Sequence, residues 1–365
     1  MKIALCTDIS EFQANRVLNR EWAKRFPGAT WLAVFAELVR PEGHIAVTGD
    51  VALANVRCGA WNAKEVLVIQ ELDSGLGRQL IDMGAKPAVL TGAESPLIAY
   101  DFYDQLPELA PAFEHRVLFG GALKIFAAES GCNYRFRFPN YHPEDIPALA
   151  PWAGRKNTVM VTANKYYQPA GQETAGQAQS RTRAMAIQDE LQSKRLEAIE
   201  FFASAGLLDL FGHGWNEPER LPQSWQERLE DTLKYLQPQP CEDKIRTIAA
   251  YKFAICFENM AYPGYITEKI IDCFVAGVIP IYLGAPDVQE HIPGDAFIDM
   301  RQFSSWQDLA GYLGSLPEKA ALDLLAAGRD FLNSAEGRLY SFAGFARFIS
   351  DMIFPEGGRW NEGAQ

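Results

Sequence analysis

The stretch YKFAICFEN, residues 251–259, decides the fold because an apolar run ends abruptly in two polar residues. Such a run predicts a buried strand, with Glu258 and Asn259 at its carboxyl end. In open α/β sheets, ligands bind beyond the carboxyl ends of the strands. The stretch therefore predicts a parallel sheet, and it marks the edge of that sheet at which a ligand binds.

A Pro263-Gly264 turn and a helix, expected at residues 267–276, follow this strand. Thr267 is a preferred N-cap residue, and the unpaired N–H groups of a first helical turn attract anions. Together with the charge of Lys269, this helix start predicts a seat for a diphosphate.

Neighbouring residues carry groups that suit a nucleotide sugar. Tyr265 can stack on a sugar or hydrogen-bond to a phosphate, and Glu268 can accept hydrogen bonds from sugar hydroxyls. The next strand, residues 278–283, ends in a Gly284 turn that lets a base or ribose approach the backbone closely. The alternative interpretation is that Glu268 and Lys269 only cap and solubilise a helix.

Short apolar runs alternate with helical patterns along the whole chain, which is typical of parallel sheets joined by crossover helices. The predicted strands are residues 3–6, 30–35, 65–69, 87–91, 116–119, 158–162, 207–211, 252–257, 278–283 and 296–299. The predicted helices are residues 11–26, 77–83, 183–205, 225–236, 267–276, 305–313, 317–333 and 338–353. We therefore expect an α/β fold.

A proline-rich connection at residues 141–152 suggests a boundary between two domains. We expect an N-terminal domain at residues 1–150 and a C-terminal domain at residues 151–335, which contains the predicted seat for a diphosphate. Residues 336–365 are expected to form a final helix that packs back across the domains.

Composition narrows the class of protein. The 34 basic and 46 acidic side chains give a formal charge of −12, which argues against a nucleic-acid partner because phosphates need a basic face. None of the six cysteines stands in a C-x-x-C pair, so we expect reduced core residues. No signal peptide or transmembrane run is visible, so we expect a cytoplasmic protein.

The order of motifs between Phe253 and Gly284 resembles the family 10 glycosyltransferases, the α-1,3/1,4-fucosyltransferases. F-x-x-x-F-E-N is followed by a short gap, Y-x-T-E-K, a helix and P-x-x-x-G. The resemblance implies a GT-B fold, with two Rossmann-like domains facing a central cleft. It also implies inverting transfer of fucose from GDP-fucose to a hydroxyl of a glycan acceptor, with the acceptor bound by the domain at residues 1–150 and the nucleotide sugar by the domain at residues 151–335. It implies these donor-site residues: Asn259, Tyr265, Glu268 and Lys269. Family habit further implies a place at the inner membrane surface.

The same resemblance extends to the predicted helix that contains Arg195. It implies an arginine there that contacts the donor diphosphate; we assign Arg195, with Arg181 and Arg183 as competitors. His213, in a glycine loop after the next strand, and Glu258 are further candidate nucleotide contacts. A purely structural histidine is the alternative for His213.

An inverting transferase needs a base that removes the acceptor proton. We assign Glu94, in the segment LTGAESP at residues 90–96, which resembles the T-G-E-x-E-S-P stretch of the family but keeps one glutamate. Glu71 and Asp73 are the next candidates for the base. The structural alternative for Glu94 is that it only lies near the N-cap of the following helix. No D-x-D motif or cluster of metal ligands is visible, so we expect no required cofactor or metal, with a divalent cation at most stimulatory.

Two alternatives stand beside fucosyl transfer. One is a transferase for another nucleotide sugar, and the other is a non-catalytic protein of the same fold that binds nucleotide sugars or glycans. A dehydrogenase is excluded because no G-x-G-x-x-G follows a predicted strand.

Overall fold

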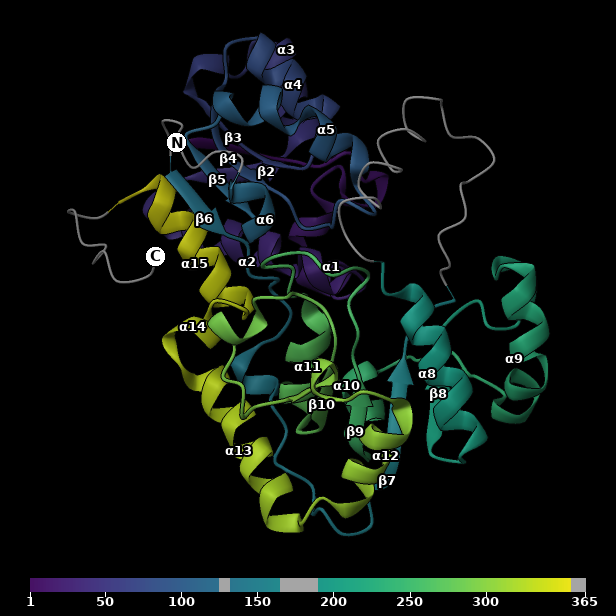
Figure 1. Ribbon diagram of the computed structural model, residues 1–365. Coiled ribbons are helices and arrows are strands. Elements are labelled where there is room, and N and C mark those ends of the chain that lie inside the picture. The colour runs from purple at the N-terminus through teal and green to yellow at the C-terminus, as the bar shows by residue number, and fades with distance from the viewer. Residues whose placement is uncertain (125–131, 165–189, 356–365) are drawn as a thin grey trace. The chain divides into compact units, whose positions relative to one another are not determined.

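The computed structural model describes residues 1–124, 132–164 and 190–355 (Figure 1). The chain divides into two compact units. Unit 1 comprises Met1–Glu94, Asp101–Pro143 and the segment that begins at Arg338, whereas unit 2 comprises Ser95–Tyr100 and Glu144–Gly337. Each unit contains one sheet whose strands all pair in parallel. The predicted class, a GT-B type fold with two Rossmann-like domains, is confirmed in these two α/β units.

The sheet of unit 1 has the strand order β2-β1-β3-β4-β5-β6. Its strands are β1 (Lys2–Cys6), β2 (Ile45–Thr48), β3 (Val66–Glu71), β4 (Lys86–Thr91), β5 (His115–Leu118) and β6 (Cys132–Arg135). Its helices are α1 (Arg20–Ala23), α2 (Thr30–Val39), α3 (Gly49–Arg57), α4 (Gly75–Asp82), α6 (Gly120–Leu123) and α15 (Phe342–Ile353), while α5 (Tyr100–Leu109) begins at the unit boundary and α14 (Ala335–Arg338) ends at it.

The prediction of a strand at residues 30–35 is wrong, because these residues form the first part of α2. Most of α2 is buried, and a helix that is apolar all round looks in sequence like a buried strand. α15 packs against it, and Trp31 meets Phe345 edge-on with ring centroids 5.1 Å apart. The final helix thus completes the core of unit 1.

The predicted helix at residues 11–26 is also wrong as a continuous element. Ala14 and Asn15 adopt left-handed backbone angles, with φ of 55° and 58°, and this breaks the run. Asn15 is held there because its backbone N–H donates to the hydroxyl of Thr48, and its side-chain oxygen accepts from the backbone N–H of Thr48. What remains is two 3-10 turns, η1 (Ser10–Phe12) and η2 (Arg16–Leu18), and the short α1.

The sheet of unit 2 has the order β11-β10-β9-β7-β8. Its strands are β7 (Lys156–Val161), β8 (Leu208–Phe211), β9 (Tyr251–Ile255), β10 (Ile279–Tyr282) and β11 (Ile298–Asp299). Its helices are α8 (Gln192–Ser204), α9 (Gln223–Leu236), α10 (Lys244–Ile248), α11 (Glu268–Ala276), α12 (Trp306–Ser315) and α13 (Glu318–Asn333). The strand predictions for this half are confirmed to within a few residues.

The strand order of unit 2 reverses direction between β7 and β9. From β7 the chain moves outward through α8 to β8, then returns past β7 to β9 and continues to β10 and β11. In doubly wound sheets such a reversal opens a crevice at the carboxyl ends of the two strands concerned, and ligands bind there.

The cysteines only partly follow the prediction of reduced core residues. All six are free, and Cys6, Cys256 and Cys273 are buried, but Cys58 and Cys132 are exposed. In the described part of the chain, we find no helix with the length and apolar character needed to cross a bilayer.

Candidate functional site

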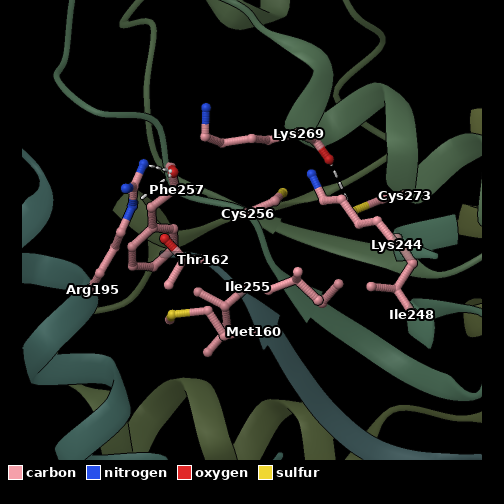
Figure 2. A pocket seen from close by; sticks show the side chains of 12 residues that line it. Met160, Thr162, Arg195, Lys244, Ile248, Ile255, Cys256, Phe257, Lys269 and Cys273 are labelled. Carbon is pink, nitrogen blue, oxygen red and sulfur yellow. Dashed lines mark hydrogen bonds between the residues drawn. The ribbon is translucent and has the colours of Figure 1, made fainter. Parts of the chain in front are cut away.

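A pocket lies where the strand order of unit 2 reverses. Thr162 follows β7, while Cys256 and Phe257 follow β9, and α8, α10 and α11 contribute the remaining walls. Three cationic side chains line it: Arg195, Lys244 and Lys269. Figure 2 shows Arg195 and Lys244 on opposite sides of Cys256. The pocket therefore places three cationic side chains at the sheet edge where the topology favours a ligand.

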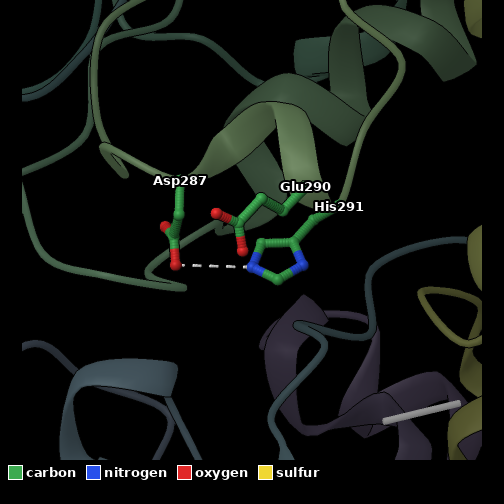
Figure 3. Close-up of side chains that lie close together, drawn as sticks. All are labelled: Asp287, Glu290 and His291. Carbon is green, nitrogen blue, oxygen red and sulfur yellow. Dashed lines mark ion pairs between the residues drawn. The ribbon is translucent and has the colours of Figure 1, made fainter.

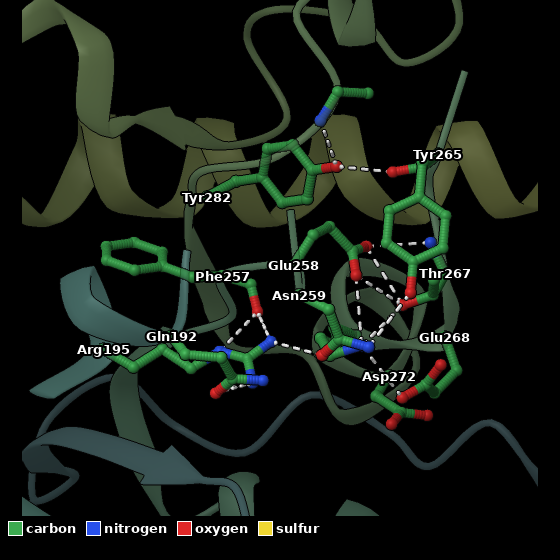
Figure 4. Close-up of polar contacts among 12 residues, drawn as sticks. Gln192, Arg195, Phe257, Glu258, Asn259, Tyr265, Thr267, Glu268, Asp272 and Tyr282 are labelled. Atoms are coloured by element: carbon green, nitrogen blue, oxygen red, sulfur yellow. Dashed lines mark hydrogen bonds and ion pairs between the residues drawn. The ribbon is translucent and has the colours of Figure 1, made fainter. Parts of the chain in front are cut away.

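Glu258 forms the centre of a buried hydrogen-bond network beside this pocket (Figure 4). Its side chain has no solvent exposure. One carboxylate oxygen accepts from the backbone N–H of Thr267 at 2.8 Å, and the other accepts from the ammonium of Lys269 at 3.0 Å. The Thr267 hydroxyl lies 2.8 Å from the carboxylate and 2.9 Å from Lys269 Nζ, so it donates to the first and accepts from the second.

This network explains the positions of two predicted site residues. A buried carboxylate is stable only when it is paired, so Glu258 holds Lys269 in place. Thr267 occupies the N-cap position of α11, but its side chain makes no cap hydrogen bond to the helix because the hydroxyl serves Glu258. Glu258 thus fixes the start of α11 and the charge beside it.

A second network runs from α8 to the loop after β9. Arg195 is 5% exposed, and its guanidinium donates to the carbonyl oxygen of Phe257 and, at 3.0 Å, to the side-chain oxygen of Asn259. The Asn259 amide in turn donates to the Tyr265 hydroxyl at 3.2 Å. Tyr265 is only 1% exposed, so its ring is part of the core and its hydroxyl belongs to this chain of hydrogen bonds.

Lys244 is a pocket residue that the sequence reading missed. It forms an ion pair with Asp272 at 2.6 Å, and the Asp272 side chain is only 5% exposed. Burial disfavours the charged form of Glu268, but the charges of Lys269 and Lys244 outweigh this and lower the pKa of Glu268 to about 2. Lys244 stands outside any motif; the available signal is Asp243, which caps α10 through a hydrogen bond from the Arg246 N–H.

Gly284 is required by packing around Glu258. A Cβ at this position would lie 2.4 Å from the Tyr282 hydroxyl and 2.5 Å from Glu258 Cγ. The space that a side chain would need is therefore already filled by the protein.

His213 takes no part in these two networks. His213 is exposed in a loop in which Gly212 and Gly214 have φ of 140° and 82°. Arg181 and Arg183 lie outside the described residues.

Unit 1 brings two carboxylates together at the ends of neighbouring strands. Glu71 ends β3, and Glu94 follows β4. Burial, reinforced by the charge of Glu94, raises the pKa of Glu71 to about 7. Asp73 is engaged differently, because it pairs with Arg78 at 2.6 Å. A carboxyl group that keeps its proton near neutral pH beside a second carboxylate is suited to acid–base chemistry.

Asp287, Glu290 and His291 form a further polar cluster in unit 2 (Figure 3). His291 Nε2 lies 3.5 Å from Asp287, whose carboxylate also accepts from the backbone N–H of Gly264 at 2.8 Å. The sequence reading did not group these three residues. Through its bond to Gly264, Asp287 ties the turn before Tyr265 to the loop after β10.

The sequence of unit 2 is similar to known fucosyltransferases. Residues 180–322 match the family model described as glycosyltransferase family 10 (fucosyltransferase) C-term. The chain is 34% identical to the alpha-(1,3)-fucosyltransferase FucT of Helicobacter pylori over 28% of this chain and 21% of that protein. It is 39% identical to a mouse 4-galactosyl-N-acetylglucosaminide 3-alpha-L-fucosyltransferase over 22% of this chain and 23% of that protein. These matches confirm the family resemblance in the C-terminal half, and they span about a fifth of each relative.

A solved structure shows the fold over almost the whole chain. Anabaena HepE in complex with UDP-glucose matches 97% of this chain and 99% of its own, with a TM-score of 0.52 and 13% identity. At this identity the match reports fold alone.

Proposed function

We propose that the chain is an inverting glycosyltransferase that transfers fucose from GDP-fucose to a hydroxyl of a glycan acceptor. The observation that carries the proposal is the group of three cations, Arg195, Lys244 and Lys269, around one pocket at the strand-order reversal of unit 2. The match of residues 180–322 to the fucosyltransferase family model supports fucose as the sugar.

In this proposal the pocket binds the donor diphosphate. Phosphate oxygens accept hydrogen bonds and carry negative charge, which the guanidinium of Arg195 and the ammonium groups of Lys244 and Lys269 complement. The first turn of α11 adds backbone N–H groups with the same polarity. Departure of the nucleoside diphosphate leaves negative charge on its terminal phosphate, and preorganised cations stabilise that charge as it develops. The reaction then requires no metal.

The carboxylate pair of unit 1 is proposed to supply the base. The acceptor oxygen attacks the anomeric carbon of fucose while the bond from that carbon to the phosphate oxygen breaks and GDP departs with the bonding electrons. Glu94 takes the proton from the acceptor hydroxyl, and its negative charge helps to keep the neighbouring Glu71 protonated. Inversion follows because attack and departure occur on opposite faces of the sugar.

The alternative donor is another nucleotide sugar, since the cations bind any nucleoside diphosphate. A screen of GDP-fucose, GDP-mannose and UDP-glucose with a panel of glycan acceptors separates these cases. We expect release of GDP from GDP-fucose that depends on an acceptor. Transfer from UDP-glucose alone would replace the proposed donor. Binding without transfer or hydrolysis of any donor would favour the non-catalytic alternative.

A further inference from the structure

The orientation of the Asn164 side chain is fixed by its partners. Asn164 follows β7, and its amide nitrogen donates to the carbonyl oxygens of Gly214 at 2.9 Å and Glu217 at 3.2 Å. Its backbone N–H donates to the carbonyl oxygen of His213 at 2.8 Å. Because carbonyl oxygens only accept hydrogen bonds, the nitrogen of the amide must face this loop, and the amide oxygen Oδ1 must face the other way.

The Asn164 oxygen is a buried acceptor without a donor. Asn164 is 1% exposed, and within the described part of the chain its Oδ1 has no hydrogen-bond partner. Nearly all buried polar atoms in folded proteins are paired, so an unpaired one needs an explanation, and a bound molecule that donates a hydrogen bond to it supplies one. Neighbouring donors are engaged elsewhere: the Trp215 indole N–H donates to the Thr162 carbonyl at 2.8 Å, and Arg195 donates to Phe257, Gln192 and Asn259.

Asn164 lines a small cavity that adjoins the cationic pocket. Thr162 and Arg195 line both spaces, so the cavity at Asn164 adjoins the space in which Arg195 would bind a ligand. A group that pairs with this oxygen must present a hydrogen atom. Ionised phosphate oxygens cannot do so, whereas a nucleoside offers ring N–H, amino and hydroxyl groups.

We propose that Asn164 is a specificity-determining residue that accepts a hydrogen bond from an N–H or O–H group of the donor nucleoside. This inference rests on the proposed function of the pocket as a diphosphate site. Arg195, Lys244 and Lys269 would bind the phosphates of any nucleoside diphosphate. Asn164 would add selectivity for a nucleoside that carries a hydrogen-bond donor at one position.

Nucleotide analogues identify the group that Asn164 recognises. Binding of GDP, inosine diphosphate, 1-methyl-GDP, 2′-deoxy-GDP and 3′-deoxy-GDP is measured by calorimetry on the native chain and on Asn164→Ala. We expect one analogue to bind the native chain about tenfold more weakly than GDP, as the loss of one hydrogen bond predicts. Asn164→Ala should bind that analogue and GDP equally. The control is Asn157→Ala, at an exposed position on β7, the strand that precedes Asn164, and this variant should keep the native preference.

Two outcomes would overturn the proposal. If Asn164→Ala weakens GDP and every analogue by the same factor, the residue acts only by holding the loop at 213–217. If a crystal structure of the native chain with GDP shows Oδ1 bonded only to a water that contacts protein groups, the Asn164 oxygen does not recognise the nucleoside. This measurement does not depend on the folding of the variant. Failure of the native chain to bind any guanine nucleotide would instead refute the proposed function.

Discussion

The ammonium of Lys269 lies 3.0 Å from a carboxylate oxygen of Glu258, a side chain with no solvent exposure. A lysine that binds phosphate must be held in place without losing its charge. Glu258 holds Lys269 through this ion pair, and its carboxylate also accepts a hydrogen bond from the backbone N–H of Thr267. One residue thus fixes both the ammonium of Lys269 and the start of α11.

Replacing Glu258 by glutamine should destabilise unit 2. The change leaves Lys269 without its buried counter-charge, and breaking a buried ion pair costs about 3–5 kcal/mol. Denaturant unfolding measures the loss, with Glu230→Gln as the control because Glu230 is an exposed residue of α9 that pairs with Lys234. Equal stability of the two variants would show that the buried pair is not stabilising.

Arg195→Lys should weaken binding of GDP although it keeps the charge. Lysine cannot reach the Phe257 carbonyl and Asn259 with a planar fork of donors, so the cation loses its orientation. We expect binding weaker by about 10- to 100-fold in calorimetry, the value of one charged hydrogen bond. Lys194→Ala removes the adjacent cation, whose partner is Glu197 on the exposed face, and should bind GDP normally. An unchanged Kd for Arg195→Lys would exclude Arg195 from the diphosphate site.

Glu94→Gln should abolish transfer without abolishing GDP binding. The amide keeps the shape of the side chain but cannot take a proton, and the loss of a general base lowers kcat by about 10²–10⁴-fold. Steady-state kinetics and calorimetry on the same preparation separate the two effects. If Glu94→Gln turns over normally and Glu71→Gln does not, the base is Glu71.

Unit 1 should lose stability as the pH rises toward neutrality. Burial raises the pKa of Glu71 from 4.5 to about 7. Because the folded state favours the protonated form, the contribution of Glu71 is fully present below pH 4.5 and is lost as the pH rises to about 7. Glu71→Gln stays neutral, so its Tm relative to the native chain should rise by a few degrees between pH 5 and pH 8. A constant difference in Tm across this range would contradict the raised pKa.

Gly284→Ala should be costly although it adds a single methyl group. The new Cβ would meet Tyr282 and Glu258 at 2.4 and 2.5 Å, and overpacking of this kind costs roughly 1–3 kcal/mol. Gly314→Ala is a matched control, since a Cβ there has no neighbour within 4 Å and lies in helix α12. Thermal unfolding should separate the two variants in opposite directions, because alanine favours the helix.

The sequence predicts unit 2 better than unit 1 for a physical reason. In unit 2, the polar residues Glu258 and Asn259 follow the apolar run of β9, and helix α11 is capped by Gly277 with a φ of 68°. Both the elements and the points at which they end can therefore be recognised in the sequence. In unit 1 the buried helix α2 lacks a polar face, and the turn at Asn15 depends on a distant partner, Thr48.

The candidate site shows the same contrast. The local motif groups Asn259, Tyr265 and Lys269, and the family resemblance adds Arg195. In the structure Asn259 bonds to both Arg195 and Tyr265, and Lys269 bonds to the neighbouring Glu258. Lys244 and Asn164 could not be predicted from the sequence because tertiary contacts fix their positions. Lys244 pairs with Asp272, and Asn164 bonds to the loop at Gly214. No periodicity records such contacts.

The position of α15 in unit 1 has a consequence for biosynthesis. The backbone N–H of Asn140 bonds to the carbonyl of Tyr340 at 2.9 Å, and Phe345 covers Trp31 of α2, so the beginning of the chain relies on a segment translated more than 300 residues later. During synthesis, the apolar surface of α2 that α15 covers stays exposed until α15, the last described helix, has emerged from the ribosome. Nascent chains that stall before Phe342 would therefore be substrates for chaperones, whereas unit 2 can already be compact.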